Sequence, residues 1–186
     1  GASLWRAKAG SQKPKSLAWA GSHLSLTWSP DGKYIVTATQ ENDLHGWRVS
    51  DGADMRMSGY PAKVRSMSWL PKGRHLATSG AEPVVCWPFH GKGGPMGKAP
   101  LDLGGGLGGL VTVVAAHPKH DVVAAGYQDG TTILVQIDRP HSVLVKRAGE
   151  GAVSALAWSA DGQHLALGTE SGYVGRIGLS DWRAPT

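Results

Sequence analysis

The sequence has little of what a secreted disulfide protein or a membrane protein needs. Cys86 is the single cysteine in 186 residues, so no disulfide can form within the chain and an oxidising compartment is not indicated. No apolar run approaches the roughly 20 residues of a helical membrane span, and no signal peptide is visible. We therefore expect no membrane partner and a cytoplasmic location.

Groups that carry out chemistry are also scarce. Asp and Glu together number 14, and most of them fall in turns, where turn geometry explains them. No nucleophile elbow and no zinc-protease helix motif is present. Cys86 lies in an apolar segment without a nearby base, and His117 and His120 in one Pro turn give half of a zinc site. We expect no catalytic residues, no metal and no cofactor.

The aromatic content is unusual in kind, because the chain has eight Trp but one Phe. Glycine is abundant at 27 residues, above its usual share of about 7%. Abundant Gly with scattered Trp and many Val, Leu and Ala is typical of short strands joined by tight turns. The composition therefore favours an all-β protein.

The main signal is an internal repeat. Four segments align on one column that holds Trp28, Trp69, Ala116 and Trp158, at steps of 41, 47 and 42 residues. In each unit an alternating strand reaches this column, a turn of the Ser-Pro-Asp-Gly kind follows, and a more apolar second strand comes next. Second strands are expected at 34–38, 75–79, 122–126 and 164–168, and fourth strands at 54–57, 99–103 and 143–147. Four strands at a period of about 40–45 residues are the signature of propeller blades.

The chain resembles the WD-repeat family, with degenerate repeats of the bacterial type. The turn at Trp28–Gly32, the Asp161–Gly162 pair and the strand-ending Trp47 and Trp87 carry the resemblance. It implies an all-β fold of four-stranded antiparallel blades, about four of them here, within a larger propeller of seven. The family also has a hydrogen-bonded set of His, Ser or Thr, Asp and Trp in each blade. No blade here clearly keeps the whole set, although Thr39, Glu41 and Trp47 could keep part of one; the Asp column holds Glu41, Ala81, Asp129 and Ser171.

We interpret the chain as a single propeller domain or a fragment of one. The blade units are expected at 1–19 (partial), 20–59, 60–104, 110–148 and 150–182. Residues 3–6 match a third-strand ending and 16–19 a fourth strand, which could instead complete the last blade. These mismatched ends predict either a piece of a longer chain or two copies in one ring, with self-association through open blade edges.

The resemblance implies a rigid platform that binds proteins or peptides at the mouth of a central channel. Loops at this mouth offer aromatic, cationic and amide groups of the sort that anchor interfaces. The candidate binding residues are Tyr60, Arg65, Gln40, Gln128, Glu170 and His23. We expect Tyr60→Ala and Arg65→Ala to leave folding intact and to weaken partner capture. The predicted function is a non-catalytic scaffold for protein–protein interaction.

Two other classes of function stay open. Some propellers are hydrolases or dehydrogenases with a site at the channel mouth, although the loops here are poor in acids and His. The net charge of +5 suggests a weak binder of nucleic acid or an anionic surface. We do not expect a nucleic-acid partner, because Lys and Arg are spread thinly along the chain.

Overall fold

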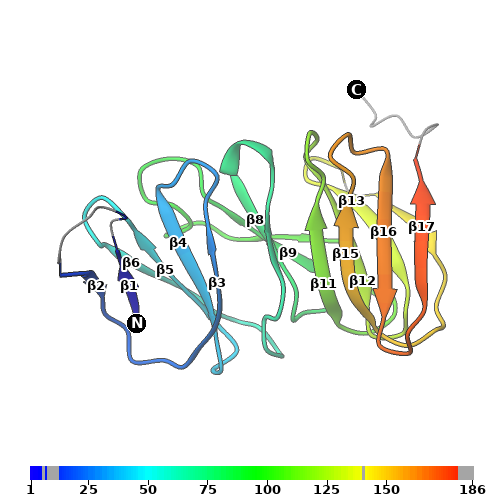
Figure 1. The fold of residues 1–186 in the computed structure, drawn as a ribbon, viewed down its shortest axis with the longest axis horizontal. Coiled ribbons are helices and arrows are strands. Elements are labelled where there is room, and N and C mark those ends of the chain that lie inside the picture. Colours follow the sequence, from blue (N-terminus) through cyan, green and yellow to red (C-terminus); the bar gives the residue numbers. More distant parts are fainter. Residues whose placement is uncertain (6, 8–12, 140, 180–186) are drawn as a thin grey trace.

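The computed structural model describes residues 1–5, 7, 13–139 and 141–179. Within these ranges the chain forms 17 β-strands and one turn of 3₁₀ helix, Pro71–Gly73. The strands build five antiparallel sheets that follow one another in chain order across Figure 1. The predicted all-β fold with four-stranded antiparallel units is confirmed.

Each sheet is a meander of neighbouring strands. A two-stranded sheet pairs β1 (Ala2–Leu4) with β2 (Lys15–Leu17). Blade 1 contains β3 (His23–Trp28), β4 (Tyr34–Thr39), β5 (Leu44–Arg48) and β6 (Asp54–Met57). Blade 2 contains β7 (Met67–Trp69), β8 (His75–Thr78), β9 (Val84–Pro88) and β10 (Leu101–Leu103). Blade 3 contains β11 (Val111–Ala116), β12 (Val122–Tyr127), β13 (Thr132–Gln136) and β14 (Ser142–Lys146). Blade 4 has three strands among the described residues: β15 (Val153–Trp158), β16 (His164–Thr169) and β17 (Val174–Gly178).

The turn after the first strand of blade 1 is closed by its own side chains. Ser29 Oγ donates to Asp31 Oδ1 at 2.7 Å and accepts the amide of Tyr34 at 2.9 Å. Gly32 has a φ of 69°, the left-handed conformation that this turn requires. In blade 4 the same contacts recur around Ser159 and Asp161.

Blade 3 closes the equivalent turn with an imidazole. His117 Nδ1 accepts the amides of Lys119 and His120, each at 3.0 Å. An imidazole nitrogen that accepts two amides is unprotonated, so the proton of the neutral ring lies on Nε2. His117 therefore takes the place of the serine that closes this turn in blades 1 and 4, as the repeat alignment predicts.

The apolar core lies between sheets rather than within any one of them. Each cluster takes side chains from two neighbouring sheets, and this packing stabilises the stack because a single blade cannot bury both of its faces. The cluster between the first two blades includes Tyr34, Leu44, Met57, Trp87 and Phe89. Blades 2 and 3 share a second cluster and blades 3 and 4 a third.

The first strand of each blade forms the inner side of the arc, and neighbouring inner strands are linked by hydroxyl groups. Ser66 Oγ accepts the amide of Val114 at 3.0 Å, and Ser68 Oγ accepts the amide of Ala116 at 2.9 Å. Trp158 Nε1 donates to the carbonyl of Ala115 at 3.0 Å. These contacts pair the free inner edge of β11 with side chains of both adjacent blades, which protects an edge strand from unwanted pairing.

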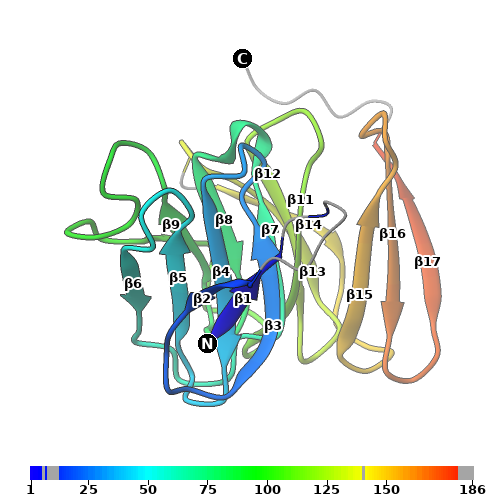
Figure 2. The same cartoon turned by 60° about the vertical axis from the view of Figure 1, so that its left-hand side comes forward.

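The two-stranded sheet lies beside blade 1 and not beside blade 4 (Figure 2). Leu17 of β2 packs against Ile35 and Trp47 of blade 1. The expectation that segment 16–19 could complete the last blade is therefore wrong, because β2 pairs with β1 and its apolar side faces blade 1.

The two-stranded sheet does not cover β3, and one face of this strand is exposed to solvent. Leu26 is 63% exposed and Trp28 is 46% exposed, whereas Trp69 and Trp158 in the same repeat column pack against the preceding blade. Among the described residues no inner strand precedes β3, so the packing role expected from the repeat fails at Trp28. No helix in the described ranges is long and apolar enough to cross a membrane.

Candidate functional site

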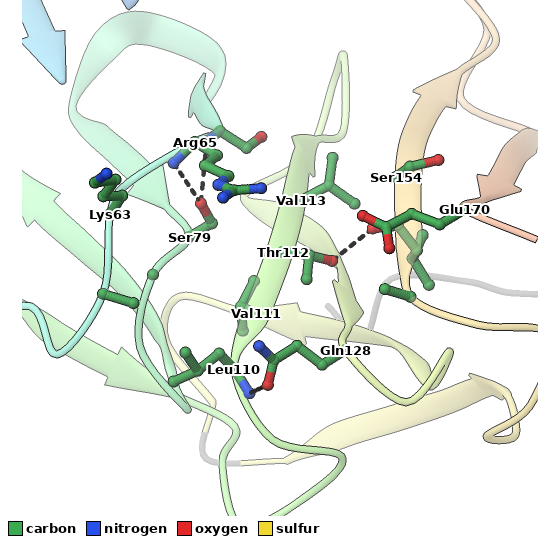
Figure 3. Close-up of a pocket in the computed structure, with 15 residues that line it drawn as sticks. Lys63, Arg65, Ser79, Leu110, Val111, Thr112, Val113, Gln128, Ser154 and Glu170 are labelled. Carbon is green, nitrogen blue, oxygen red and sulfur yellow. Dashed lines mark hydrogen bonds between the residues drawn. The ribbon is translucent and has the colours of Figure 1, made fainter. Parts of the chain in front are cut away.

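A groove of about 690 Å³ lies where the inner strands of blades 2, 3 and 4 begin. Figure 3 shows that β11 runs through it, with Lys63 and Arg65 on one side and Glu170 on the other. The wall residues come from the loops before β7, β11 and β15 and from the loops after β8, β12 and β16. We call this hollow the rim groove; it is lined by Ala62, Lys63, Arg65, Ser66, Ser79, Gly80, Leu110, Val111, Thr112, Val113, Gln128, Ala152, Val153, Ser154 and Glu170.

The positive side of the rim groove is set by an alternating segment. Val64 is fully buried in the cluster between blades 1 and 2, so its neighbours Lys63 and Arg65 point outward. The buried hydroxyl of Ser79 accepts the amides of Arg65 at 3.1 Å and Ser66 at 3.0 Å. The backbone that carries the guanidinium is therefore fixed even though the side chain is exposed.

The opposite side is set by equivalent positions in two blades. The amide of Gln128 donates to the carbonyl of Leu110 at 3.1 Å, and the amide of Glu170 donates to the carbonyl of Ala152 at 2.9 Å. Gln128 Oε1 also accepts the amide of Leu110 at 3.2 Å. Each bond ties the loop after a second strand to the start of its own inner strand, which places both exposed side chains at the groove.

The structure brings three of the six sequence-predicted residues together, namely Arg65, Gln128 and Glu170. Gln40 has the same backbone bond in blade 1, to the carbonyl of Ser22 at 2.9 Å, and is exposed, but it lies outside the groove.

Tyr60 does not offer an exposed aromatic ring, because it belongs to the core. It is 8% exposed, and its hydroxyl lies 2.7 Å from Thr78 Oγ1 and accepts the indole N–H of Trp87 at 2.6 Å. Burial raises the pKa of the Tyr60 phenol above its ordinary value. The expectation that Tyr60→Ala leaves folding intact is corrected, since truncation would leave a cavity in the core and the buried indole N–H of Trp87 without its acceptor.

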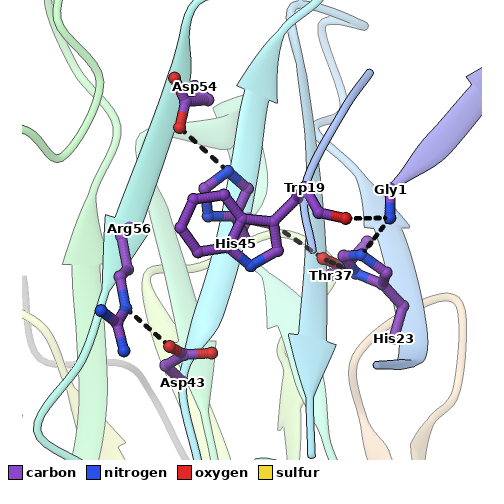
Figure 4. Close-up of polar contacts among 8 residues, drawn as sticks. All are labelled: Gly1, Trp19, His23, Thr37, Asp43, His45, Asp54 and Arg56. Atoms are coloured by element: carbon purple, nitrogen blue, oxygen red, sulfur yellow. Dashed lines mark hydrogen bonds and ion pairs between the residues drawn. The ribbon is translucent and has the colours of Figure 1, made fainter. Parts of the chain in front are cut away.

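His23 takes part in a separate polar cluster on blade 1, drawn in Figure 4. Its Nδ1 atom lies 2.9 Å from Thr37 Oγ1, which donates to the carbonyl of His45 at 3.0 Å. In blade 2 Thr78 Oγ1 donates to the carbonyl of Val85 in the matching way. The contact between Tyr60 and Thr78 in blade 2 corresponds to the contact between His23 and Thr37 in blade 1. The phenol of Tyr60, from the segment before β7, therefore takes the place of the imidazole. The threonine beside His23 is thus Thr37, whereas Thr39, which the sequence named for the polar set, donates its hydroxyl to Asp43.

The same cluster holds a fully buried imidazole. His45 stacks on Trp19 with ring centroids 3.7 Å apart, and its Nε2 lies 3.2 Å from Asp54 Oδ2. Burial lowers the pKa of His45, and Asp54 opposes this shift. Arg56 donates to buried Asp43 at 2.7 Å alongside. The ring contact between His45 and Trp19 links blade 1 to the segment that follows β2, while the Nδ1 atom of His45 has no hydrogen-bond partner among the described residues.

Groups that could catalyse a reaction do not converge at the rim groove. Cys86 is buried between blades 2 and 3, and burial raises the pKa of its thiol to about 12. In the described part of the chain no three His, Cys, Asp or Glu side chains are grouped to hold a metal ion. The groove can therefore bind a partner through its shape and its charges, with the carboxylate of Glu170 on one side and the cations of Lys63 and Arg65 on the other.

Sequence reasoning missed Lys63, Thr112 and Ser154. Lys63 lies in a loop that the repeat alignment places at the mouth, so the outward alternation around Val64 is a signal that could have found it. Thr112 and Ser154 lie near the start of inner strands, and no sequence signal separates them from other strand hydroxyls.

Comparison with known proteins gives the same family. The family model described as WD domain, G-beta repeat matches residues 17–48. Protein hir1 of Schizosaccharomyces pombe is 28% identical over 168 residues, which cover 80% of this chain and 18% of that protein. The chromatin assembly factor 1 subunit FAS2 homolog of Oryza sativa is 26% identical over 151 residues, covering 77% of this chain and 26% of that protein.

A solved structure shows the same fold. The β-propeller domain of Cps50 (Swd1) from Myceliophteria thermophila aligns with a TM-score of 0.68 at 19% identity, covering 88% of this chain and 54% of that one. The chain thus spans about half of this solved propeller and about a quarter or less of the two curated relatives. The four consecutive blades and this solved neighbour show a β-propeller fold, and the repeat model at residues 17–48 together with the curated relatives makes the chain similar to the WD-repeat family.

Proposed function

We propose that this chain is a non-catalytic scaffold for protein–protein interaction and that the rim groove is its recognition surface. The observation that carries the proposal is the groove itself. Loops from three blades meet there and present Lys63, Arg65, Gln128 and Glu170 around a hollow of about 690 Å³. A concave site with a few convergent polar groups on a rigid support is the usual form of a binding site.

The relatives support this role. One of them is, by its name, a subunit of a chromatin assembly factor, and a subunit of an assembly has protein partners. The cytoplasmic location expected from the sequence stays a prediction, and fluorescence imaging of the tagged chain in its own cell tests it.

The proposal is tested by filling the groove without changing its charge. Ser154 is exposed and lines the groove, so Ser154→Trp should block the site and leave the blades intact. Ser142→Trp on the outer strand β14 is the matched control. We expect the wild type and Ser142→Trp to capture the same proteins from extract of its own cell, and Ser154→Trp to lose a subset that rebinds in purified form. Identical captured sets for all three proteins would contradict the proposal.

A further inference from the structure

The rim groove has one charged side of each sign, and neither side is neutralised by the protein. Lys63, Arg65 and Glu170 are exposed, and within the described residues none of their charged groups forms an ion pair. By contrast, Asp31, Asp43 and Asp51 each have a basic partner. These three unpaired charges thus lie on opposite sides of one strand, β11 (Figure 3).

The floor between these charges has already used its hydrogen-bonding groups. Thr112 Oγ1 lies 2.6 Å from the carbonyl oxygen of Val153 and 3.0 Å from that of Gly126, so its single hydrogen is taken up by these two acceptors. Ser79 Oγ holds two amides of its own blade. The hydroxyl groups on the floor of the groove are therefore already hydrogen-bonded within the protein. A bound molecule gains its specificity from the charged residues on the two sides.

Strand addition is also closed to a bound peptide at β11. The inner-edge amides of Val114 and Ala116 already donate to Ser66 and Ser68, so a peptide cannot join this sheet through its backbone. A peptide here must be read through its side chains.

We propose that the rim groove binds an extended peptide segment of mixed charge, with an acidic side chain against Lys63 and Arg65 and a basic side chain against Glu170. This inference rests on the proposed function and names the chemistry of the partner. Complementary charges on a rim give specificity and speed of association more than raw affinity, and they are screened by salt. Binding should therefore weaken as salt rises.

The experiment is a selection from a random library of short displayed peptides, carried out with the 186-residue chain. Peptides are kept when they bind the wild type and Ser142→Trp but not Ser154→Trp, which defines binding in the groove. We expect the kept peptides to be enriched in both acidic and basic residues at a fixed spacing. Enrichment of one sign alone, or of neither, would overturn the mixed-charge proposal while leaving the proposed function standing. Recovery of no groove-dependent peptide would overturn both.

Charge-reversal variants test which side of the groove binds the acidic and which the basic side chain of the peptide. One kept peptide is synthesised with its acid or its base replaced by Gln, and its Kd is measured by fluorescence anisotropy. Arg65→Glu should weaken the parent peptide about tenfold and leave the peptide without its acid little changed, and Glu170→Lys should do the same for the base. If both variants weaken the binding of all peptides equally, the charges act through the fold. This result would overturn the assignment of the acidic side chain to Arg65 and of the basic side chain to Glu170.

Discussion

His117 of blade 3 holds the turn of blade 4, with its Nε2 atom 3.2 Å from the carbonyl oxygen of Gly162. The other ring nitrogen accepts two amides of its own turn, so one neutral imidazole fixes two turns in neighbouring blades. Burial lowers the pKa of His117, because it removes water from the charged form of the ring. Protonation would also remove the acceptor that the two amides need.

Acid should weaken the fold through this histidine. Since its pKa is lower in the folded chain than in the unfolded chain, its contribution to stability is complete above the unfolded value of about 6.5 and is lost as the pH falls toward the folded value. The urea midpoint should therefore fall between about pH 7.5 and pH 5. His117→Ser should reduce this slope, because serine closes the same turn in blades 1 and 4. Part of the slope should remain in this variant, because burial also lowers the pKa values of His23, His45 and His75.

The control is His141→Ser, since His141 is exposed just before β14 and is not among the groups that shift the pKa of His117. It should keep the slope of the wild type. If His117→Ser also keeps that slope, the imidazole is not the titrating group.

Substitution of Gly162 should separate backbone strain from steric clash. Gly162 has a φ of 78°, and an added Cβ would overlap the imidazole of His117. Gly32 has a φ of 69° in the equivalent turn, with no atom within 4 Å of an added Cβ. Gly32→Ala should cost about 1–2 kcal/mol from the left-handed backbone alone, and Gly162→Ala should cost clearly more. Equal losses in chemical denaturation would show that the clash is relieved without cost.

The hydroxyl of Tyr60 should stabilise the fold by joining Trp87 to Thr78. Tyr60→Phe should cost about 1–3 kcal/mol, because it leaves the buried indole N–H of Trp87 without its acceptor. Tyr60→Ala should cost about 3–5 kcal/mol through the cavity as well. Arg65→Ala is the exposed control and should stay within about 0.5 kcal/mol. A Tyr60→Phe variant as stable as the wild type in urea would contradict this role.

The bare face of β3 should promote self-association of the chain. Leu24, Leu26 and Trp28 present adjacent apolar groups to solvent, and exposed patches of this kind favour association. Leu26→Lys should lower the weight-average mass in sedimentation at high concentration. Leu101→Lys, a smaller exposed apolar site on an outer strand, should not; loss of association with both variants would locate the contact elsewhere.

Much of the fold could be predicted from the repeat. The fourth strand expected at 54–57 is β6, and the second strand expected at 122–126 falls within β12. Alternation and turn residues are local, so one sequence is enough to read them.

The candidate site could be predicted only in part. Gln128 and Glu170 were found because the repeat puts them at equivalent loop positions. Tyr60 was misplaced because the polar set in each blade is defined in space, and its partner Thr78 lies 18 residues away. The solvent exposure of Trp28 depends on which strands pack beside it, and its position in the repeat does not determine this.

Since each apolar cluster joins two sheets, the protection of backbone amides from solvent exchange should vary along the arc. Every residue of β4 and of β12 is buried, whereas exposed and half-buried residues alternate along β17. In stacked arrays each unit draws its stability from its neighbours. Amide hydrogens in β12 should exchange slowly and those in β17 early, so that blade 4 opens without unfolding blades 1 and 2. The Glu170 side of the rim groove lies on that less protected blade, and ordering it on binding would lower the apparent affinity of any partner.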